Sequence, residues 1–265
     1  KPKRTDTGRR LYSEQDILKA RMLFELTERK LKISDIARFS VIELKMLYFK
    51  ERHQATQTSP LIQALMRDAY EQKWDSIQDA LRNQRKILGP KKMIYQVILP
   101  LLREISAQVS QKQLSITQEH LFSSMIKENL YLLQENSKPS KSKIRLVIAA
   151  PENDFHEIGL LIAQVLAVHA GIKTLYLGPN MPKRELCEAS LNYRATHLLI
   201  SSTLSKKEGA KEDLFDLIHF LDTHLPKKIH LSVAGRNSNG LKLGISRKNK
   251  VLDSFEEYEK FIEQN

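Results

Sequence analysis

The sequence has a single cysteine, Cys187, among its 265 residues, so no disulfide can form within the chain. A cysteine in a predicted helix is more often a half-buried structural residue than a reactive thiol, and we expect the former. Aromatic residues are scarce, at 7%, with one tryptophan. No apolar run approaches the ~20 residues of a membrane-spanning helix, and no secretory signal is visible. We therefore expect a cytoplasmic protein without a membrane partner.

Acidic residues are also few, since 43 lysines and arginines outnumber 31 aspartates and glutamates. The resulting charge of +12 is uneven: residues 1–53 carry +6, residues 54–143 carry +5 and residues 144–265 carry +1. A basic N-terminal half is typical of proteins that bind nucleic acid, although lysine-rich surfaces also serve solubility. No Ser-His-Asp arrangement, phosphate-binding loop or carboxylate pair indicates catalysis, so we do not expect an enzyme.

Residues 144–265 alternate between strand and helix patterns. Apolar segments predict strands over Ile144–Ala150, Ile172–Leu177, His197–Ser202, Lys228–Ala234 and Lys242–Ser246. The remaining segments predict helices over His156–Ala170, Lys183–Arg194, Asp213–His224 and Phe255–Glu263. This alternation is typical of a doubly wound α/β domain with a largely parallel sheet, and such sheets bind ligands beyond the carboxyl ends of their strands.

Three short motifs lie at the carboxyl ends of predicted strands. In the first, Asp154 can bind one imidazole nitrogen of His156, fix its tautomer and leave the other nitrogen for a metal ion. Gly159 would let a large ligand approach the backbone closely. The other two motifs are Ser202-Thr203-Leu204 and Ala234-Gly235. Each motif alone is an ordinary loop of small residues, but together at one edge of a sheet they favour a shared ligand.

The middle of the chain shows helical periodicity. Four helices are predicted, over Leu61–Lys73, Trp74–Leu88, Met93–Val109 and Ile116–Leu133. Gly89-Pro90 and Leu114-Ser115 mark turns between them. A capping box that begins at Ser115 places Glu119 and His120 near the start of the last helix. We expect a four-helix bundle over residues 56–137 and a polar linker over residues 138–143.

The first twelve residues carry five basic side chains and one acid. Thr5-Asp6-Thr7-Gly8 suits the turn of a β-hairpin, and arginines on a hairpin can contact a phosphate backbone. A disordered basic terminus is the alternative. Ser13, with Glu14 and Asp16 after it, predicts the N-cap and acidic first turn of a helix.

The three motifs of residues 144–265 are similar to those of cobalamin-binding domains of the methionine synthase type. The resemblance implies a flavodoxin-like domain that binds cobalamin with its dimethylbenzimidazole tail displaced into a slot. His156 would be the lower axial ligand of cobalt, and Asp154 would orient it. The other matching residues are Gly159, Ser202, Thr203, Leu204, Ala234 and Gly235. Ala234 stands in place of one of the family's two glycines.

The N-terminal segment, from Pro2 to Ser13, resembles the wing of MerR-type transcription factors. This implies a partial winged-helix DNA-binding domain over residues 1–55, with Arg4, Arg9, Arg10 and Tyr12 in contact with operator DNA. In that family the helix-turn-helix precedes the wing. Because the sequence begins at Lys1, inside the wing, we infer that it is a trimmed version of a longer protein whose base-reading residues lie outside this numbering.

Wing, bundle and α/β domain in this order resemble the light-sensing cobalamin regulators of the MerR type, a multidomain α and α/β architecture. In that family the bundle caps the corrin with a tryptophan, followed ten residues later by Glu-His. Here Glu119-His120 matches, and Val109 stands at the tryptophan position. The resemblance implies adenosylcobalamin or another cobalamin form as cofactor, with His120 as a possible upper ligand of cobalt.

The same resemblance implies a repressor that binds operator DNA as a dimer or tetramer until light breaks the cobalt–carbon bond. Val109 and Ala234 depart from the family at positions that face the ligand, and two alternatives therefore stay open. One is a cobalamin-independent MerR-type regulator, apo or bound to another tetrapyrrole. The other is a corrinoid carrier protein of a methyltransferase, against which the basic wing argues.

Overall fold

The computed structural model describes residues 3–4, 9–28, 31–54, 59–135, 142–203, 210–235 and 243–264. The chain divides into two compact units, one of Lys1–Ile87 with Lys92–Phe122 and one of Leu88–Lys91 with Ser123–Asn265. The second unit therefore includes part of the segment that we assigned to the bundle. Within the described ranges, no helix is long and apolar enough to cross a membrane.

The N-terminal part of the first unit contains the predicted hairpin and helix start. Strands β1 (Lys3–Arg4) and β2 (Arg10–Leu11) pair antiparallel. Helix α1 (Glu14–Glu28) begins with a capping box, because the Ser13 hydroxyl accepts the Asp16 amide and the Asp16 carboxylate accepts the Ser13 amide. Helices α2 (Ile33–Ile36) and α3 (Val41–Gln54) follow. A small core joins the three helices and consists of Met22, Leu26, Ile36, Leu44 and Tyr48.

The four predicted bundle helices are all present. They are α4 (Pro60–Tyr70), α5 (Trp74–Met93), α6 (Leu99–Ser110) and α7 (Ile116–Leu132), with a π-helical turn, η1 (Ile94–Ile98), before α6. Gly89 interrupts α5 with a φ of +69°, at the predicted turn. The wider π turn precedes Pro100, whose ring would clash with the backbone of a regular helix. Ser115 and Gln118 form the predicted capping box of α7.

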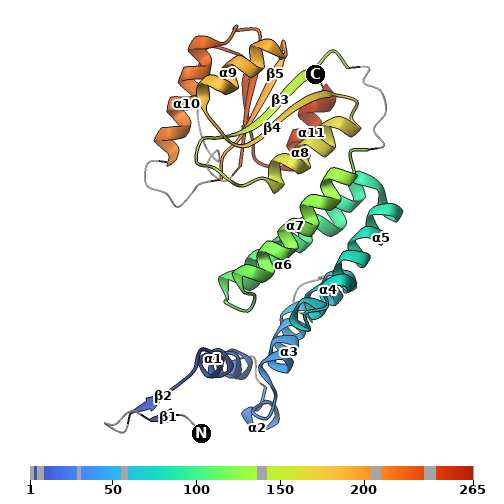
Figure 1. The fold of residues 1–265 in the computed structure, drawn as a ribbon, viewed down its shortest axis with the longest axis vertical. Coiled ribbons are helices and arrows are strands. Elements are labelled where there is room, and N and C mark those ends of the chain that lie inside the picture. The colour runs from blue at the N-terminus through green and yellow to red at the C-terminus, as the bar shows by residue number, and fades with distance from the viewer. Residues whose placement is uncertain are drawn as a thin grey trace. The chain divides into compact units, whose positions relative to one another are not determined.

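A five-stranded parallel sheet forms the centre of the second unit (Figure 1). Its strands are β3 (Arg145–Pro151), β4 (Lys173–Met181), β5 (His197–Ser201), β6 (His230–Ala234) and β7 (Asn249–Leu252), in the order β4-β3-β5-β6-β7. The apolar run of β3 is buried along nearly its whole length, as expected for a central strand covered on both faces.

Helices cover both faces of this sheet (Figure 1). Helices α8 (Ile158–His169) and α11 (Phe255–Gln264) lie on one face, and α9 (Lys183–Asn192) and α10 (Ala210–His224) lie on the other. Cys187 is buried in the core beneath α9, where burial raises the pKa of its thiol. It is thus a structural residue, and it is more deeply buried than we expected.

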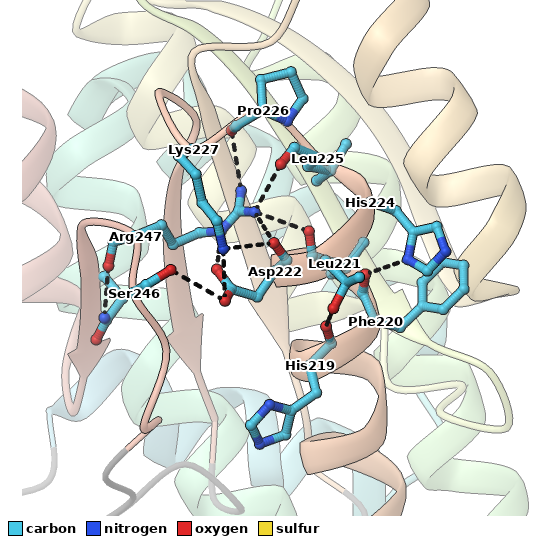
Figure 2. Close-up of polar contacts among 12 residues, drawn as sticks. His219, Phe220, Leu221, Asp222, His224, Leu225, Pro226, Lys227, Ser246 and Arg247 are labelled. Atoms are coloured by element: carbon cyan, nitrogen blue, oxygen red, sulfur yellow. Dashed lines mark hydrogen bonds and ion pairs between the residues drawn. The ribbon is translucent and has the colours of Figure 1, made fainter.

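The predicted strand at Lys242–Ser246 is wrong: of these residues, 243–246 form no strand, and the last strand is Asn249–Leu252. Gly244 has a φ of +59°, which an extended strand does not allow. The side chain of Arg247, three residues on, is only 1% exposed. Figure 2 shows it among backbone groups at the end of α10. The hydrogen bonds of Arg247 therefore hold the segment before β7 against the end of α10.

Arg247 caps the end of α10 (Figure 2). Its Nη2 donates to the carbonyl oxygens of Leu221, Asp222 and Leu225, each at 2.9 Å, and its Nε donates to the Asp222 carboxylate at 2.7 Å. These bonds satisfy carbonyl groups that a helix end leaves without partners. Burial alone would raise the pKa of Asp222, but hydrogen bonds from Lys227 and Arg247 lower it to about 2.

Replacement of Arg247 by Met should lower the free energy of unfolding by about 1–3 kcal/mol, since it leaves several carbonyls without their donor and leaves the partly buried Asp222 carboxylate with Lys227 as its remaining charged partner. Urea denaturation of the full chain, followed by circular dichroism, measures the change. The matched control is Arg184→Met, at an exposed position on α9, which should alter stability by less than about 0.5 kcal/mol. Equal stability of the two variants would contradict this role of Arg247.

Candidate functional site

The sequence motifs meet at one edge of the sheet because all five strands are parallel. Asp154 follows β3, Ser202 and Thr203 follow β5, and Ala234 and Gly235 lie at the end of β6. Ser201 and Ala234 are register partners, and the Ser202 amide donates to the Ala234 carbonyl at 2.9 Å. Leu204 lies outside the described residues, and its role stays a prediction.

Asp154 is buried and joins two of these loops. Its Oδ2 accepts the Thr203 amide at 2.7 Å, and its Oδ1 accepts the Thr203 hydroxyl at 3.1 Å. Its Oδ1 also accepts the backbone amide of His156 at 3.1 Å. The Asp154 carbonyl accepts the Asn180 amide at 2.8 Å, which ties the loop to β4. The loop that carries His156 is therefore held from the ends of two other strands.

The imidazole of His156 is oriented by the same carboxylate. Its Nδ1 lies 2.8 Å from Asp154 Oδ1. Because a carboxylate can only accept a hydrogen bond, Nδ1 carries the proton in this contact, and Nε2 keeps its lone pair. The side chain of His156 is 63% exposed while that of Asp154 is 1% exposed. The result is an accessible imidazole of fixed tautomer, which can ligate a metal ion through Nε2.

A cavity of about 410 Å³ lies at the same edge, between α8, α11 and the ends of β5, β6 and β7. Four residues predicted from the sequence line it: Gly159, Thr203, Ala234 and Gly235. The other lining residues are Leu160, Ala163, Leu199, Ser201, Leu252, Asp253, Ser254, Phe255 and Tyr258. Sequence reasoning missed the Leu252–Tyr258 wall because it placed the last strand too early.

Tyr258 is buried, like Leu252 at the other end of that wall. Its hydroxyl donates to the Ala163 carbonyl at 3.0 Å, and burial raises the pKa of the phenol. The bond ties α11 to α8, the two helices on one side of the cavity. An aromatic residue four positions into a helix that follows the last strand is the sequence signal that could have identified this wall.

Gly235 allows the two strand ends to approach each other. Its φ is +100°, and a Cβ at this position would lie 2.3 Å from the carbonyl oxygen of Ser202. No L side chain fits there without a backbone shift. Gly159 differs, since a Cβ would meet nothing within 4 Å and would extend into the open space of the cavity.

The remaining predicted residues lie in the first unit. Val109 is partly buried on α6, Glu119 is partly buried on α7, and His120 is exposed on α7. In the hairpin, Arg4 and Arg10 are register partners, and Arg9 and Tyr12 are exposed. Their contacts with a cofactor or with DNA stay predictions.

Gly235→Ala should lower the melting temperature of the chain, because the new methyl group and the positive φ each cost on the order of 1–3 kcal/mol. Gly159→Ala is the matched control and should leave the melting temperature of the ligand-free chain unchanged or slightly raised. Thermal unfolding followed by circular dichroism compares the two. If Gly235→Ala were as stable as Gly159→Ala, the Ser202 backbone would move aside at little cost. The close approach of the two strand ends would then not require glycine at position 235.

Residues 1–40 match the model of the MerR HTH family regulatory protein. The chain is 27% identical over 244 residues to the HTH-type transcriptional repressor CarH of Myxococcus xanthus, a match that covers 88% of this chain and 79% of CarH. It is 30% identical over 104 residues to the HTH-type transcriptional repressor CarA of Myxococcus xanthus, or 39% of this chain and 34% of CarA.

Among solved structures, the monomethylamine corrinoid protein of Methanosarcina barkeri is similar in fold, with a TM-score of 0.62 and 13% identity. The likeness covers 76% of this chain and 96% of that chain. At this identity it shows the fold alone, and it confirms the predicted combination of helical and parallel α/β parts. The predicted resemblance is also confirmed: the chain is similar to the HTH-type transcriptional repressor CarH over most of its length, and residues 1–40 match the model of the MerR HTH family.

Proposed function

We propose that the chain is a cobalamin-dependent, DNA-binding transcriptional repressor. One observation carries the cofactor assignment: Asp154 binds Nδ1 of His156, so that Nε2 is left for a metal ion, at the edge of the sheet where a cavity opens between α8 and α11. The similarity to the CarH repressor over most of the chain supports the regulatory part. CarH and CarA are named as transcriptional repressors, and we extend that role to this chain.

The residues of the cavity fit the displaced tail of a cobalamin. The cavity of about 410 Å³ lies within the usual range for a buried ligand. Apolar side chains of Leu160, Ala163 and Leu199 would contact an aromatic ring, while Ser201 and Thr203 add hydroxyl groups. Gly235 lines the cavity and lets the end of β6 lie close to the backbone of Ser202. Ala234 adds one methyl group, the smallest side chain that can replace the family's glycine.

In this proposal the protein orients the imidazole that ligates the metal, and the bound cofactor supplies the chemistry. Asp154 would keep Nδ1 of His156 protonated, so that Nε2 binds cobalt. Bound cobalamin would supply a cobalt ion whose upper ligand can be exchanged, by light in the case of an alkyl group. Thr203 holds Asp154 in place, and a carboxylate that orients a ligating histidine, as Asp154 would, commonly contributes about 10–100-fold to the affinity of a metal site.

The hairpin would supply the contact with DNA. Arg4, Arg9, Arg10 and Tyr12 lie on or beside β1 and β2, in the segment that matches the MerR family model. Arginine side chains contact phosphate oxygens and fix the register of a protein on the duplex. The charge of +6 on residues 1–53, against +1 on residues 144–265, agrees with DNA at the N-terminal half.

We further propose that adenosylcobalamin is the form that favours DNA binding, that the chain then binds operator DNA as a dimer or tetramer, and that light releases it. In this scheme Val109 would face the upper side of the corrin. Compared with tryptophan it loses an aromatic contact of about 0.5–1.5 kcal/mol and leaves more room. His120, exposed on α7, would take the upper position on cobalt once the adenosyl group leaves.

The full chain, mixed in the dark with adenosylcobalamin and desalted, should retain the corrinoid, and green light should then change its absorption spectrum and its size in gel filtration. His156→Ala should weaken retention by at least about tenfold, because it removes the lower ligand. His219→Ala, at an exposed position on α10, is the matched control and should bind like the parent.

The outcomes separate the alternatives. Retained corrinoid without a light response would leave a sensor of the cofactor itself, and the light proposal would be wrong. Equal retention by the parent and His156→Ala would contradict the assignment of the lower ligand. No retained corrinoid would favour a cobalamin-independent regulator, for which Val109 and Ala234 would be the reason. Retained corrinoid without any operator binding by the full-length protein would favour a corrinoid carrier.

A further inference from the structure

Glu157, the residue after His156, brings three side chains together around its carboxylate. Tyr131 Oη donates to Oε1 at 2.9 Å, and Tyr176 Oη donates to Oε1 at 3.3 Å. Lys127 Nζ donates to Oε2 at 3.2 Å. Tyr176 belongs to β4, whereas Lys127 and Tyr131 belong to α7. The carboxylate therefore connects the His156 loop with α7, a helix that precedes the alternating strands and helices of residues 144–265.

The position of Glu157 explains why its carboxylate is available for this contact. Glu157 is the N-cap residue of α8, a place where an acidic side chain often accepts amides of its own helix. Here it makes no such capping bond. Lys127 and Tyr131 are four residues apart and so lie on one face of α7, one turn from each other. Both can reach the same carboxylate without a change in the helix.

The electrostatics favour a stable set of donors. Burial, followed by the hydrogen bond to Glu157, raises the pKa of Tyr131, and burial followed by the charge of Glu157 raises the pKa of Tyr176. Both phenols therefore stay protonated and donate at neutral pH. The Glu157 side chain is 20% exposed and the Lys127 side chain is 37% exposed, so the ion pair is partly shielded from water. Hydrogen bonds to a charged acceptor are stronger than those between neutral groups.

A second contact holds the end of α7 to the same unit. His169 Nε2, at the end of α8, lies 2.7 Å from the Leu133 carbonyl oxygen, which accepts its proton. Lys127, Tyr131 and Leu133 all fall within the compact unit that contains the sheet. The last turns of α7 thus pack with the α/β domain through α8 at one point and through Glu157 at another.

We propose that Glu157 is a positioning residue that couples α7 to the His156 loop, so that a displacement of α7 moves the imidazole. His156 and Glu157 are adjacent, and Asp154 holds both the amide and the ring of His156. A shift of Glu157 therefore passes directly to the ligating side chain. Helix α7 is 17 residues long, and it also carries Glu119 and His120 near its start. The role of this coupling at cobalt rests on the proposed function, whereas the coupling itself belongs to the protein without cofactor.

Hydrogen exchange of the full, cofactor-free chain, read by mass spectrometry, tests the coupling. Tyr131→Phe removes one hydroxyl from α7 and should speed exchange of the amides in the 152–158 loop by roughly threefold, the value of one hydrogen bond to a charged acceptor at a half-exposed position. Lys127→Met should act in the same direction. Tyr193→Phe is the matched control, because Tyr193 stacks on Arg145 and makes no contact with Glu157, and it should leave the loop unchanged.

A double-mutant cycle separates coupling from general loosening. After Glu157→Gln, Tyr131→Phe should have a much smaller effect on the loop than it has in the parent, because the charged acceptor is gone. Unchanged loop exchange in both Tyr131→Phe and Lys127→Met, with intact circular dichroism spectra, would overturn the proposal. Fully additive effects of Glu157→Gln and Tyr131→Phe would overturn it as well.

The cobalamin complex supplies an independent readout at the ligand. In Glu157→Gln, the absorption bands that report the imidazole-bound form should give way to the imidazole-free form at a higher pH than in the parent, because the ring is less well held. An unshifted pH profile would contradict the proposal. If the parent retains no corrinoid, the proposed function is wrong, and the exchange experiment still decides whether α7 and the His156 loop are coupled.

Discussion

The buried carboxylate of Asp154 is the interaction on which the rest of the site depends. A buried carboxylate is costly unless hydrogen bonds replace its hydration, and four donors do so here: the amide and hydroxyl of Thr203, and the amide and ring of His156. The two Thr203 bonds hold the loop after β3 against the end of β5, and the bond to the His156 ring determines its tautomer. Stability and ligand geometry therefore have one cause.

The parallel sheet makes this arrangement possible, since it brings the ends of β3, β5 and β6 to one edge. Gly235 then lets the Ala234 end approach Ser202 more closely than any side chain would allow. At the far end of α10, Arg247 holds the chain on its way to β7, and β7 leads into the Leu252–Tyr258 wall of the cavity. Contacts outside the motifs thus shape the cavity that the motifs line.

Sequence reasoning predicted the four strands whose apolar runs are continuous and the helices between them, because buried parallel strands leave a clear pattern. It also expected Asp154, Thr203 and Gly235 to meet at one edge of the sheet, because they follow the ends of parallel strands, and the structure places them there. It misplaced the last strand, because nothing in an apolar pattern reveals that Arg247 turns inward to cap α10. It could not foresee the Glu157 contacts, because Lys127, Tyr131 and Tyr176 are distant in sequence and carry no local signal.

The central claim, that His156 ligates cobalt through Nε2, is tested most directly by electron paramagnetic resonance of the reduced Co(II) cobalamin complex. The protein should be prepared with ¹⁵N in its histidines only. Coupling of cobalt to one axial ¹⁵N nucleus, seen as doublets that disappear in His156→Ala, is the result that we predict. Triplets from an axial ¹⁴N nucleus would show that the cofactor keeps its own dimethylbenzimidazole, and they would contradict the assignment.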